Sequence, residues 1–182
     1  MKNFNKLAII LFTGLSVIFN SCSSDSSIGG GSTGPATGGY IKAKAAGSDF
    51  LAQGAMFTGT FNDNALNIVG SSTTGKGLNI QLYGIGAALA TGTTYNMNAT
   101  NESDSYTGSI TLTDVNLSTF TSTVYNSLNC DNANGTLTIT VNDATKIEGT
   151  FSCTAKEVKA NEACDGATKS ITSGSFRVLK AN

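Results

Sequence analysis

Few side chains in this sequence have the types and spacing that enzyme catalysis requires. The chain contains no histidine, which excludes Ser-His-Asp and Cys-His mechanisms as well as His-ligated zinc. Glu102 and Asp104 lie two residues apart, and Asp63 lies between two asparagines. A glycosidase needs two carboxylates across a cleft, but these acids all lie in polar, turn-like segments. We therefore interpret them as solvated loop residues and predict no catalytic residue.

The motifs for metal, phosphate and nucleophile chemistry are incomplete. Residues 129–135 (NCDNANG) and 62–64 (NDN) each carry a single carboxylate, and neither follows the calcium-loop pattern. Residues 70–77 (GSSTTGKG) end in glycine, where a phosphate-binding loop requires serine or threonine. A lysine base could activate a hydroxyl nucleophile, but the S-x-x-K spacing is missing around the candidates Lys76, Lys146 and Lys169. We predict no metal site and no cofactor.

Aromatic residues and charge limit the classes of ligand. Four tyrosines could line a sugar or lipid pocket, namely Tyr83, Tyr95, Tyr106 and Tyr125. The absence of tryptophan weakens a carbohydrate platform. Tyr106 is in phase with Ile110, which predicts a core position, whereas Tyr83 is in phase with polar residues and is expected to be exposed. A single arginine and a net charge of −1 argue against nucleic-acid binding, which needs clustered positive charge.

Residues 40–182 are predicted to form one all-β domain. Apolar residues alternate with Thr, Ser and Asn in several segments, of which the clearest are 78–83, 106–112, 136–141 and 147–153. This period of two is typical of antiparallel strands with one buried face. Asn, Asp and Gly separate the segments at short intervals, as hairpin turns require. We expect a single antiparallel β-sandwich or barrel of about nine or ten strands, meander-like and without a substantial helix.

A short Gly-x-Phe motif recurs in these strands. A glycine stands two residues before a phenylalanine at 59–61, 149–151 and 174–176. The spacing is too irregular for a repeat protein. We interpret each glycine as a strand bend or as a slot beneath an aromatic ring.

Three cysteines lie within the domain, at positions 130, 153 and 164. If residues 135–142 pair with 145–154 around a tight turn, position 134 faces about position 153. Cys130 then lies just beyond that end of the hairpin, from which the loop that carries Cys164 also leaves. Cys153 shares the phase of the apolar residues in its strand, so its side chain should point into the core.

The cysteine spacing therefore favours a disulfide between Cys130 and Cys164, with Cys153 a buried thiol that packs as a small apolar residue. A Cys153–Cys164 bridge remains the alternative, because connectivity cannot be deduced from sequence alone. A metal site built from the three cysteines is the least favoured of the three arrangements, since the chain has no C-x-x-C spacing and no histidine to complete the ligand set.

The N-terminus has the pattern of a secretory signal. Lys2 and Lys6 precede a run of 13 weakly polar to apolar residues, 7–19, which is too short to span a bilayer as a helix. Ser21 and Cys22 follow, and this ending resembles a bacterial lipoprotein signal, in which the cysteine becomes the acylated N-terminus. Residues 1–21 are therefore predicted to be removed. Residues 22–39, rich in Ser and Gly, are predicted to be the lipidated cysteine and a flexible tether.

The whole layout resembles a family of small all-β lipoproteins of unknown function from Bacteroidota of the flavobacterial type. The segments that carry the likeness are NSC (20–22), YIKAKAAGSDFLAQ (40–53), LNIQLYGI (78–85), GTTYNMN (92–98), GTLTITVNDATKIEGTFSCTA (135–155) and TKSITSGSFRV (168–178). The resemblance implies a lipid-anchored β domain at the outer membrane, on either its periplasmic or its outer face. It supplies no catalytic residue.

Two functions follow as hypotheses. The first is a non-enzymatic binding or structural domain of the cell envelope, held to the membrane at Cys22, whose partner is a protein, a glycan or a small ligand. The second is a lipocalin-like carrier of a small apolar molecule, which needs a closed barrel around a cavity. A packed interior favours the first hypothesis, and an internal cavity of several hundred cubic ångströms favours the second.

Overall fold

The computed structural model describes residues 35, 37–62, 65–85, 89–98, 105–128, 130, 133–161 and 163–180, all of which belong to the compact unit Thr33–Asn182. They form eleven strands and one short 3-10 helix, η1. In chain order the elements are β1 Tyr40–Ala45, β2 Ser48–Gln53, η1 Gly54–Met56, β3 Phe57–Asn62, β4 Ala65–Ser71, β5 Lys76–Tyr83, β6 Thr94–Asn96, β7 Thr107–Asn116, β8 Thr121–Asn126, β9 Asn134–Asn142, β10 Lys146–Glu157 and β11 Thr168–Leu179.

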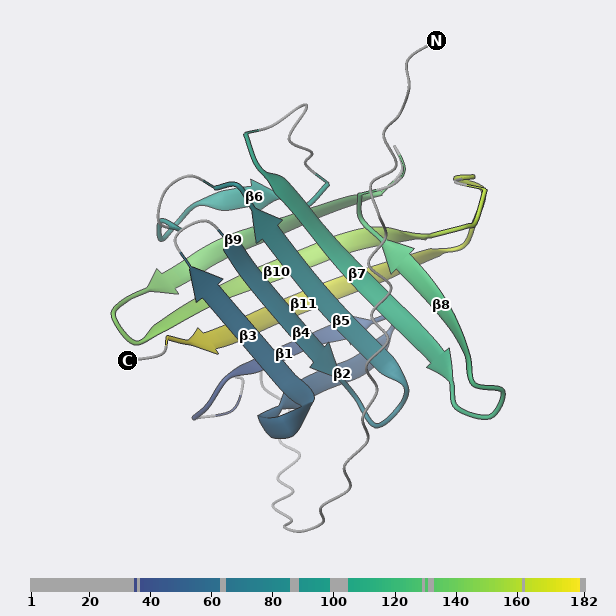
Figure 1. Ribbon diagram of the computed structural model, residues 1–182, viewed down its shortest axis with the longest axis horizontal. Helices are drawn as coiled ribbons and strands as arrows, with labels where there is room; N and C mark the ends of the chain where they lie inside the picture. Colours follow the sequence, from purple (N-terminus) through teal and green to yellow (C-terminus); the bar gives the residue numbers. More distant parts are fainter. Residues whose placement is uncertain are drawn as a thin grey trace. The chain divides into compact units, whose positions relative to one another are not determined.

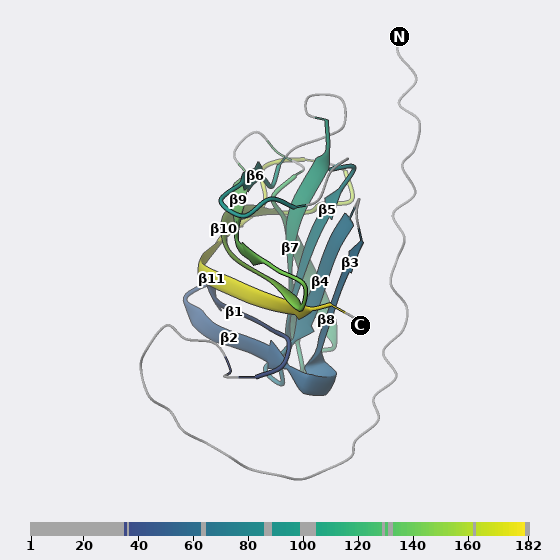
Figure 2. The ribbon, with the colours of Figure 1, turned by 90° about the vertical axis from the view of Figure 1, so that its left-hand side faces the viewer.

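All pairings between these strands are antiparallel, and together they form one curled sheet. Its main path is β2-β1-β11-β10-β8-β7-β5-β4-β3, while β9 pairs with β10 and β6 pairs with β9. The sheet folds into two facing layers, with β3, β4, β5, β7 and β8 on one side and β1, β2, β6, β9, β10 and β11 on the other (Figure 1, Figure 2). The result is a nearly closed, flattened barrel, which confirms the all-β prediction.

The two layers are joined differently at their two corners. At one corner β10 pairs with β9 along most of its length, and then only Lys156 and Glu157 pair with β8. At the other corner β2 and β3 are consecutive strands linked by η1, and the described residues of β3 pair only with β4. The barrel therefore has one short hydrogen-bonded corner and one open seam.

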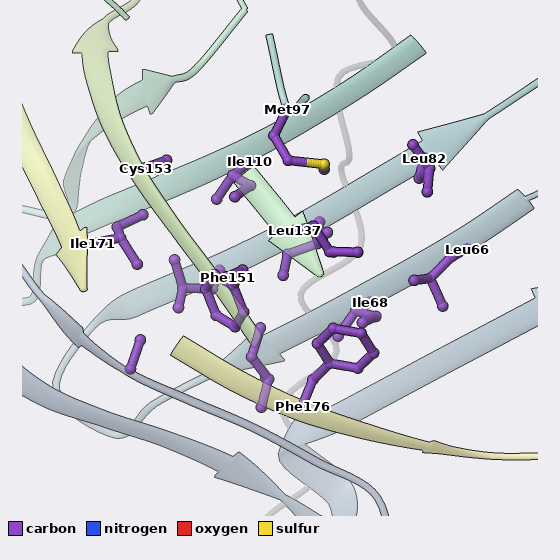
Figure 3. Close-up of a cluster of buried hydrophobic side chains, with 14 of the residues drawn as sticks. Leu66, Ile68, Leu82, Met97, Ile110, Leu137, Phe151, Cys153, Ile171 and Phe176 are labelled. Atoms are coloured by element: carbon purple, nitrogen blue, oxygen red, sulfur yellow. The ribbon is translucent and has the colours of Figure 1, made fainter. Parts of the chain in front are cut away.

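The core lies between the layers, where apolar side chains from both sides meet (Figure 3). Leu66, Ile68 and Ile110 come from the first layer, and Leu137 and Phe176 come from the second; all five are buried. Where β4 faces β1 and β2, a Cβ atom added at Gly70 would collide with Ile41 and lie 2.8 Å from the Cβ atom of Ala52. The layers are thus in direct van der Waals contact there.

Two of the Gly-x-Phe triplets pack against each other across β10 and β11. Gly149 pairs with Phe176, and Phe151 pairs with Gly174. A Cβ atom added at Gly149 would lie 2.6 Å from Cζ of the Phe176 ring, and one added at Gly174 would lie 2.7 Å from Cδ2 of the Phe151 ring. Each glycine therefore provides the space that the partner strand's ring occupies, which confirms the predicted slot beneath an aromatic ring.

The strand count and one register differ from the prediction. There are eleven strands, nine of them on the main path of the sheet, where about nine or ten were expected, and the β9–β10 hairpin pairs Gly135 with Cys153, one residue from the expected position. The turn is longer than expected because the carboxylate of Asp143 accepts hydrogen bonds from the backbone of Thr145 and Lys146, at 2.7 and 2.9 Å. A register shift after Glu148 then reduces the offset between the observed and the expected strand pairing.

Candidate functional site

The open seam of the barrel carries a shallow groove with a volume of about 600 Å³. It lies at the start of β3, beside η1 and the segment that leads into β1, and extends to the end of β11. Its lining residues are Thr37, Gly38, Gly39, Gln53, Gly54, Phe57, Thr58, Gly59 and Leu179. None of these side chains is ionisable, so the groove offers hydroxyl, amide, backbone and apolar contacts.

Phe57 is the largest side chain of the groove, and two glycines determine where its ring lies. The ring packs against the core while remaining partly exposed. A Cβ atom added at Gly39 would lie 2.5 Å from Cε1 of the ring, and one added at Gly59 would lie 2.9 Å from Cζ. Gly54, with a φ of +56°, makes the turn from β2 into η1. Because Gly39 and Gly59 have no side chains, the Phe57 ring can lie against the backbone both of the segment that leads into β1 and of β3.

Arg177 on β11 fixes the segment that leads into the domain. Its guanidinium group donates a hydrogen bond to the carbonyl oxygen of Pro35 at 3.0 Å and lies 5.4 Å from the centre of the Tyr40 ring. Its Nε atom forms an ion pair with Glu148 on β10, which also accepts a hydrogen bond from Lys146 at 3.1 Å. The arginine therefore connects Pro35, ahead of β1, to two strands of the sheet.

This cluster gives the fold a dependence on pH. Burial of Glu148 acts to raise its pKa, but hydrogen bonds from Arg177 and Lys146 and their positive charges outweigh burial and lower the pKa. A carboxyl group with a lowered pKa in the folded chain stabilises the fold above its unfolded-state pKa. That stabilisation is lost as the pH falls through the folded-state pKa.

We expect the substitution Glu148→Gln to lower the free energy of unfolding by about 1 kcal/mol near pH 7 and by much less near pH 2. Urea unfolding at both pH values measures the difference. Asp49→Asn, which removes the exposed Lys44–Asp49 pair, is the control and should have a smaller effect. A loss for Glu148→Gln that is equal at the two pH values would contradict the assignment.

The cysteines are arranged as predicted. Cys130 and Cys164 form a disulfide with a Cα–Cα distance of 5.8 Å, and Cys153 is a free thiol with 5 % of its surface exposed. Burial raises the pKa of the Cys153 thiol to about 12, so it is not a nucleophile at neutral pH. The disulfide links the segment before β9 to the β10–β11 connection, beside the short hydrogen-bonded corner.

The other candidate residues that the structure describes do not assemble into a second site. Asp63, Glu102 and Asp104 lie outside the described residues, as does Cys22. Within the described ranges no group of three or more His, Cys, Asp or Glu side chains could hold a metal ion, and no helix is long and apolar enough to cross a bilayer. The three lysines considered as bases each interact with another side chain. Lys76 forms an ion pair with Asp114 at 3.2 Å, Lys146 forms one with Glu148, and Lys169 lies 5.7 Å from the centre of the Tyr125 ring.

The tyrosines are dispersed rather than gathered around a pocket. Tyr83 at the end of β5 is 41 % exposed, as predicted. Tyr106 packs against the core while remaining partly exposed, and its ring meets that of Tyr95 edge to face at 5.5 Å. Its hydroxyl accepts a hydrogen bond from the backbone nitrogen of Asn96. Tyr125 is buried, and none of the four lines the groove.

Sequence reasoning missed the groove, because its walls come from four separate segments, 37–39, 53–54, 57–59 and Leu179. The glycine at position 59 was the one visible signal, and it indicated ring packing rather than a site. No protein-family model, curated protein or solved structure matches the chain. The function of the groove must therefore be inferred from its own residues.

Proposed function

We propose that this protein is a lipid-anchored binding domain of the bacterial cell envelope, without catalytic activity. The observation that carries the location is the Cys130–Cys164 disulfide, because such bonds persist in extracytoplasmic compartments and are rare in the cytosol. The N-terminal pattern of lysines, short apolar run and Ser21-Cys22 supports secretion followed by acylation of Cys22. Both observations support an outer-membrane lipoprotein of the kind known from Bacteroidota.

The groove at the seam is the proposed binding site. Its uncharged lining suits a neutral, partly apolar ligand or protein segment, with Phe57 and the half-exposed Leu179 as apolar contacts. A carrier of the lipocalin type would hold its ligand inside the barrel. The direct contact of the two layers at Gly70 favours a ligand in the groove over a ligand in the interior.

Replacing Cys22 by alanine is expected to move the protein from the membrane fraction to the soluble periplasmic fraction. The reason is that two or three acyl chains hold a protein on a bilayer almost permanently, whereas the processed protein without them lacks that permanent attachment. Fractionation of cells followed by immunoblotting measures the change. Cys153→Ala, which removes a different free cysteine, should leave the protein in the membrane fraction. A Cys22→Ala protein that has lost residues 1–21 by intact mass and still stays membrane-bound would contradict the anchor.

Native mass spectrometry of the detergent-extracted protein tests the groove. A bound molecule that is lost on denaturation should also be lost in Leu179→Lys, which places a charge in the groove. It should be retained in Leu51→Lys, which changes a leucine of β2 that is similarly exposed, at 47 % against 52 % for Leu179. Retention in both variants would place the ligand elsewhere, and a wild-type protein without a bound molecule would indicate a macromolecular partner.

A further inference from the structure

One end of the five-stranded layer gathers three connections of the chain. The register places the start of β3, the β4–β5 turn and the β7–β8 turn at the same end, which is the lower edge of the layer in Figure 1. A hydrogen bond from the backbone nitrogen of Val115, near the end of β7, to the carbonyl oxygen of Gly75 joins that strand end to the β4–β5 turn. The start of β3 also borders the groove, where it meets Thr37 and Gly39 of the segment that leads into the domain. The tether therefore arrives at this end.

The same end exposes three large apolar side chains. Phe120 and Leu117, in the β7–β8 turn, are 85 % and 54 % exposed, and Met56, in η1, is 40 % exposed. No other large apolar side chain among the described residues is as exposed as Phe120. Leu117 also lies against the β4–β5 turn, where a Cβ atom added at Gly75 would be 3.3 Å from its Cγ atom.

The exposed side chain of Phe120 contributes little buried apolar surface to the stability of the fold. Its backbone conformation is also unfavourable for an aromatic residue. Its φ is +54°, in the left-handed region that large side chains avoid. The turn before it is held by the Asn116 side chain, which accepts hydrogen bonds from the backbone of Ser118 and Thr119 at 2.9 and 3.2 Å. The hydrogen-bonded turn thus holds an aromatic side chain in an exposed position.

The three connections are almost free of charge. Residues 53–57, 71–76 and 116–121 contain a single ionisable side chain, Lys76, and it is paired with Asp114 at 3.2 Å. Apolar side chains on a neutral, hydroxyl-rich rim can enter the interface of a bilayer without removing an unpaired charge from water. An acidic or basic protein partner would find no complementary charge here.

We propose that this end of the barrel rests on the membrane, with Phe120 and Leu117 inserted among the lipids. The inference rests on the proposed acylation of Cys22. Only residues 23–34 separate Cys22 from Pro35, and a Ser/Gly-rich segment of that length spans about 20 Å. The anchor therefore holds the turn at a high local concentration next to the bilayer, so that two apolar side chains suffice for a contact that would be weak in a free protein.

The contact has a direct consequence for the orientation of the molecule. If the end with η1 and the β7–β8 turn faces the lipids, the opposite end of the same layer points away from the membrane. Tyr83, at the far end of β5, then lies on the side that faces the aqueous phase. The two ends can be distinguished by a probe placed in each.

The chain contains no tryptophan, so Phe120→Trp and Tyr83→Trp each introduce a single tryptophan, which can be excited selectively over the tyrosines, one at either end of the layer. The acylated full-length proteins are reconstituted in phosphatidylcholine–phosphatidylglycerol vesicles with and without brominated acyl chains, which quench tryptophan on contact. We expect the brominated lipid to reduce the emission of Trp at position 120 by about half or more and that at position 83 by less than about a tenth. Intact mass of the N-terminal peptide and vesicle flotation report acylation and membrane binding independently.

The possible outcomes distinguish the membrane contact from a protein contact and from the lipid anchor. Acylated, vesicle-bound protein whose fluorophore at position 120 is not quenched overturns the contact while leaving the lipid anchor intact, and so does stronger quenching at position 83. A fluorophore at position 120 that is unquenched by lipid but shielded from iodide after addition of envelope proteins would replace the lipid with a protein partner. Protein that is neither acylated nor vesicle-bound overturns the proposed function, and the inference with it.

Discussion

Replacing Cys130 and Cys164 by serine is expected to lower the free energy of unfolding by about 3–4 kcal/mol, because the bridge closes a loop between residues 34 apart. The location adds to the effect. The β10–β11 connection that the bridge holds is otherwise fixed near its two ends, by hydrogen bonds between Glu157 and Ala167, from Lys156 to Gly166 and from Val158 to Val124, and by the exposed Lys159–Asp165 ion pair. The adjacent β8–β10 corner consists of two residue pairs, so it has few other contacts to compensate.

Urea unfolding of the double variant and of the wild type, each with and without a reducing agent, measures the contribution. The reducing agent should destabilise the wild type and leave the double variant unchanged. Thiol labelling should modify Cys153 only after unfolding, because its side chain is buried in the native state. Equal stabilities, or a peptide map that shows a Cys153–Cys164 bridge, would refute the assignment.

Replacing Gly149 by alanine is expected to lower the free energy of unfolding by about 2–3 kcal/mol through overpacking. The new methyl group would lie 2.5 Å from the carbonyl oxygen of Thr138 and 2.6 Å from Cζ of Phe176. The carbonyl belongs to β9, which pairs with β10, so it cannot move without breaking the ladder. The Phe176 ring is fully buried and has no free space to enter.

Gly77→Ala is the matched control for this prediction. Gly77 also lies inside a strand, but a Cβ atom there would meet its nearest neighbours at 3.7 and 3.8 Å, which is ordinary contact. Removing the backbone freedom of a glycine should leave this variant as stable as the wild type, or more stable by up to about 1 kcal/mol. Thermal and urea unfolding of both variants decide the matter. If Gly149→Ala is as stable as Gly77→Ala, the ring does not occupy the slot.

Most of the fold was accessible from the sequence, because one-face burial produces a period of two that is easy to recognise. The segment Leu78–Leu82 and the strand that carries Ile139 illustrate this, since each buried residue alternates with a polar one. Registers were less accessible. The β9–β10 turn depends on how many backbone groups the Asp143 carboxylate accepts, and composition does not determine that number.

The candidate site was much less predictable than the fold. The disulfide followed from the strand phase of Cys153, because a side chain that points into the core is unavailable to a surface loop. The groove and the exposed turn followed from no such periodicity. Phe120 lies in a mostly polar segment that looks like any hairpin connection, and neither its left-handed backbone nor its exposure has a signature in the sequence. The groove requires the end of β11, with Leu179, and the start of β3, with Phe57, to line the same hollow although the two strands are not neighbours in the sheet.

The position of β11 has a consequence for the order in which the molecule can be completed. This strand lies between β1 and β10, so β1 has no partner on that side until residues 168–179 are available. A chain that is delivered from its N-terminus therefore exposes Ile41 and its apolar neighbours throughout delivery. Contacts between such distant segments form slowly, and under the export that we propose this delay would keep the chain unfolded while it crosses the membrane.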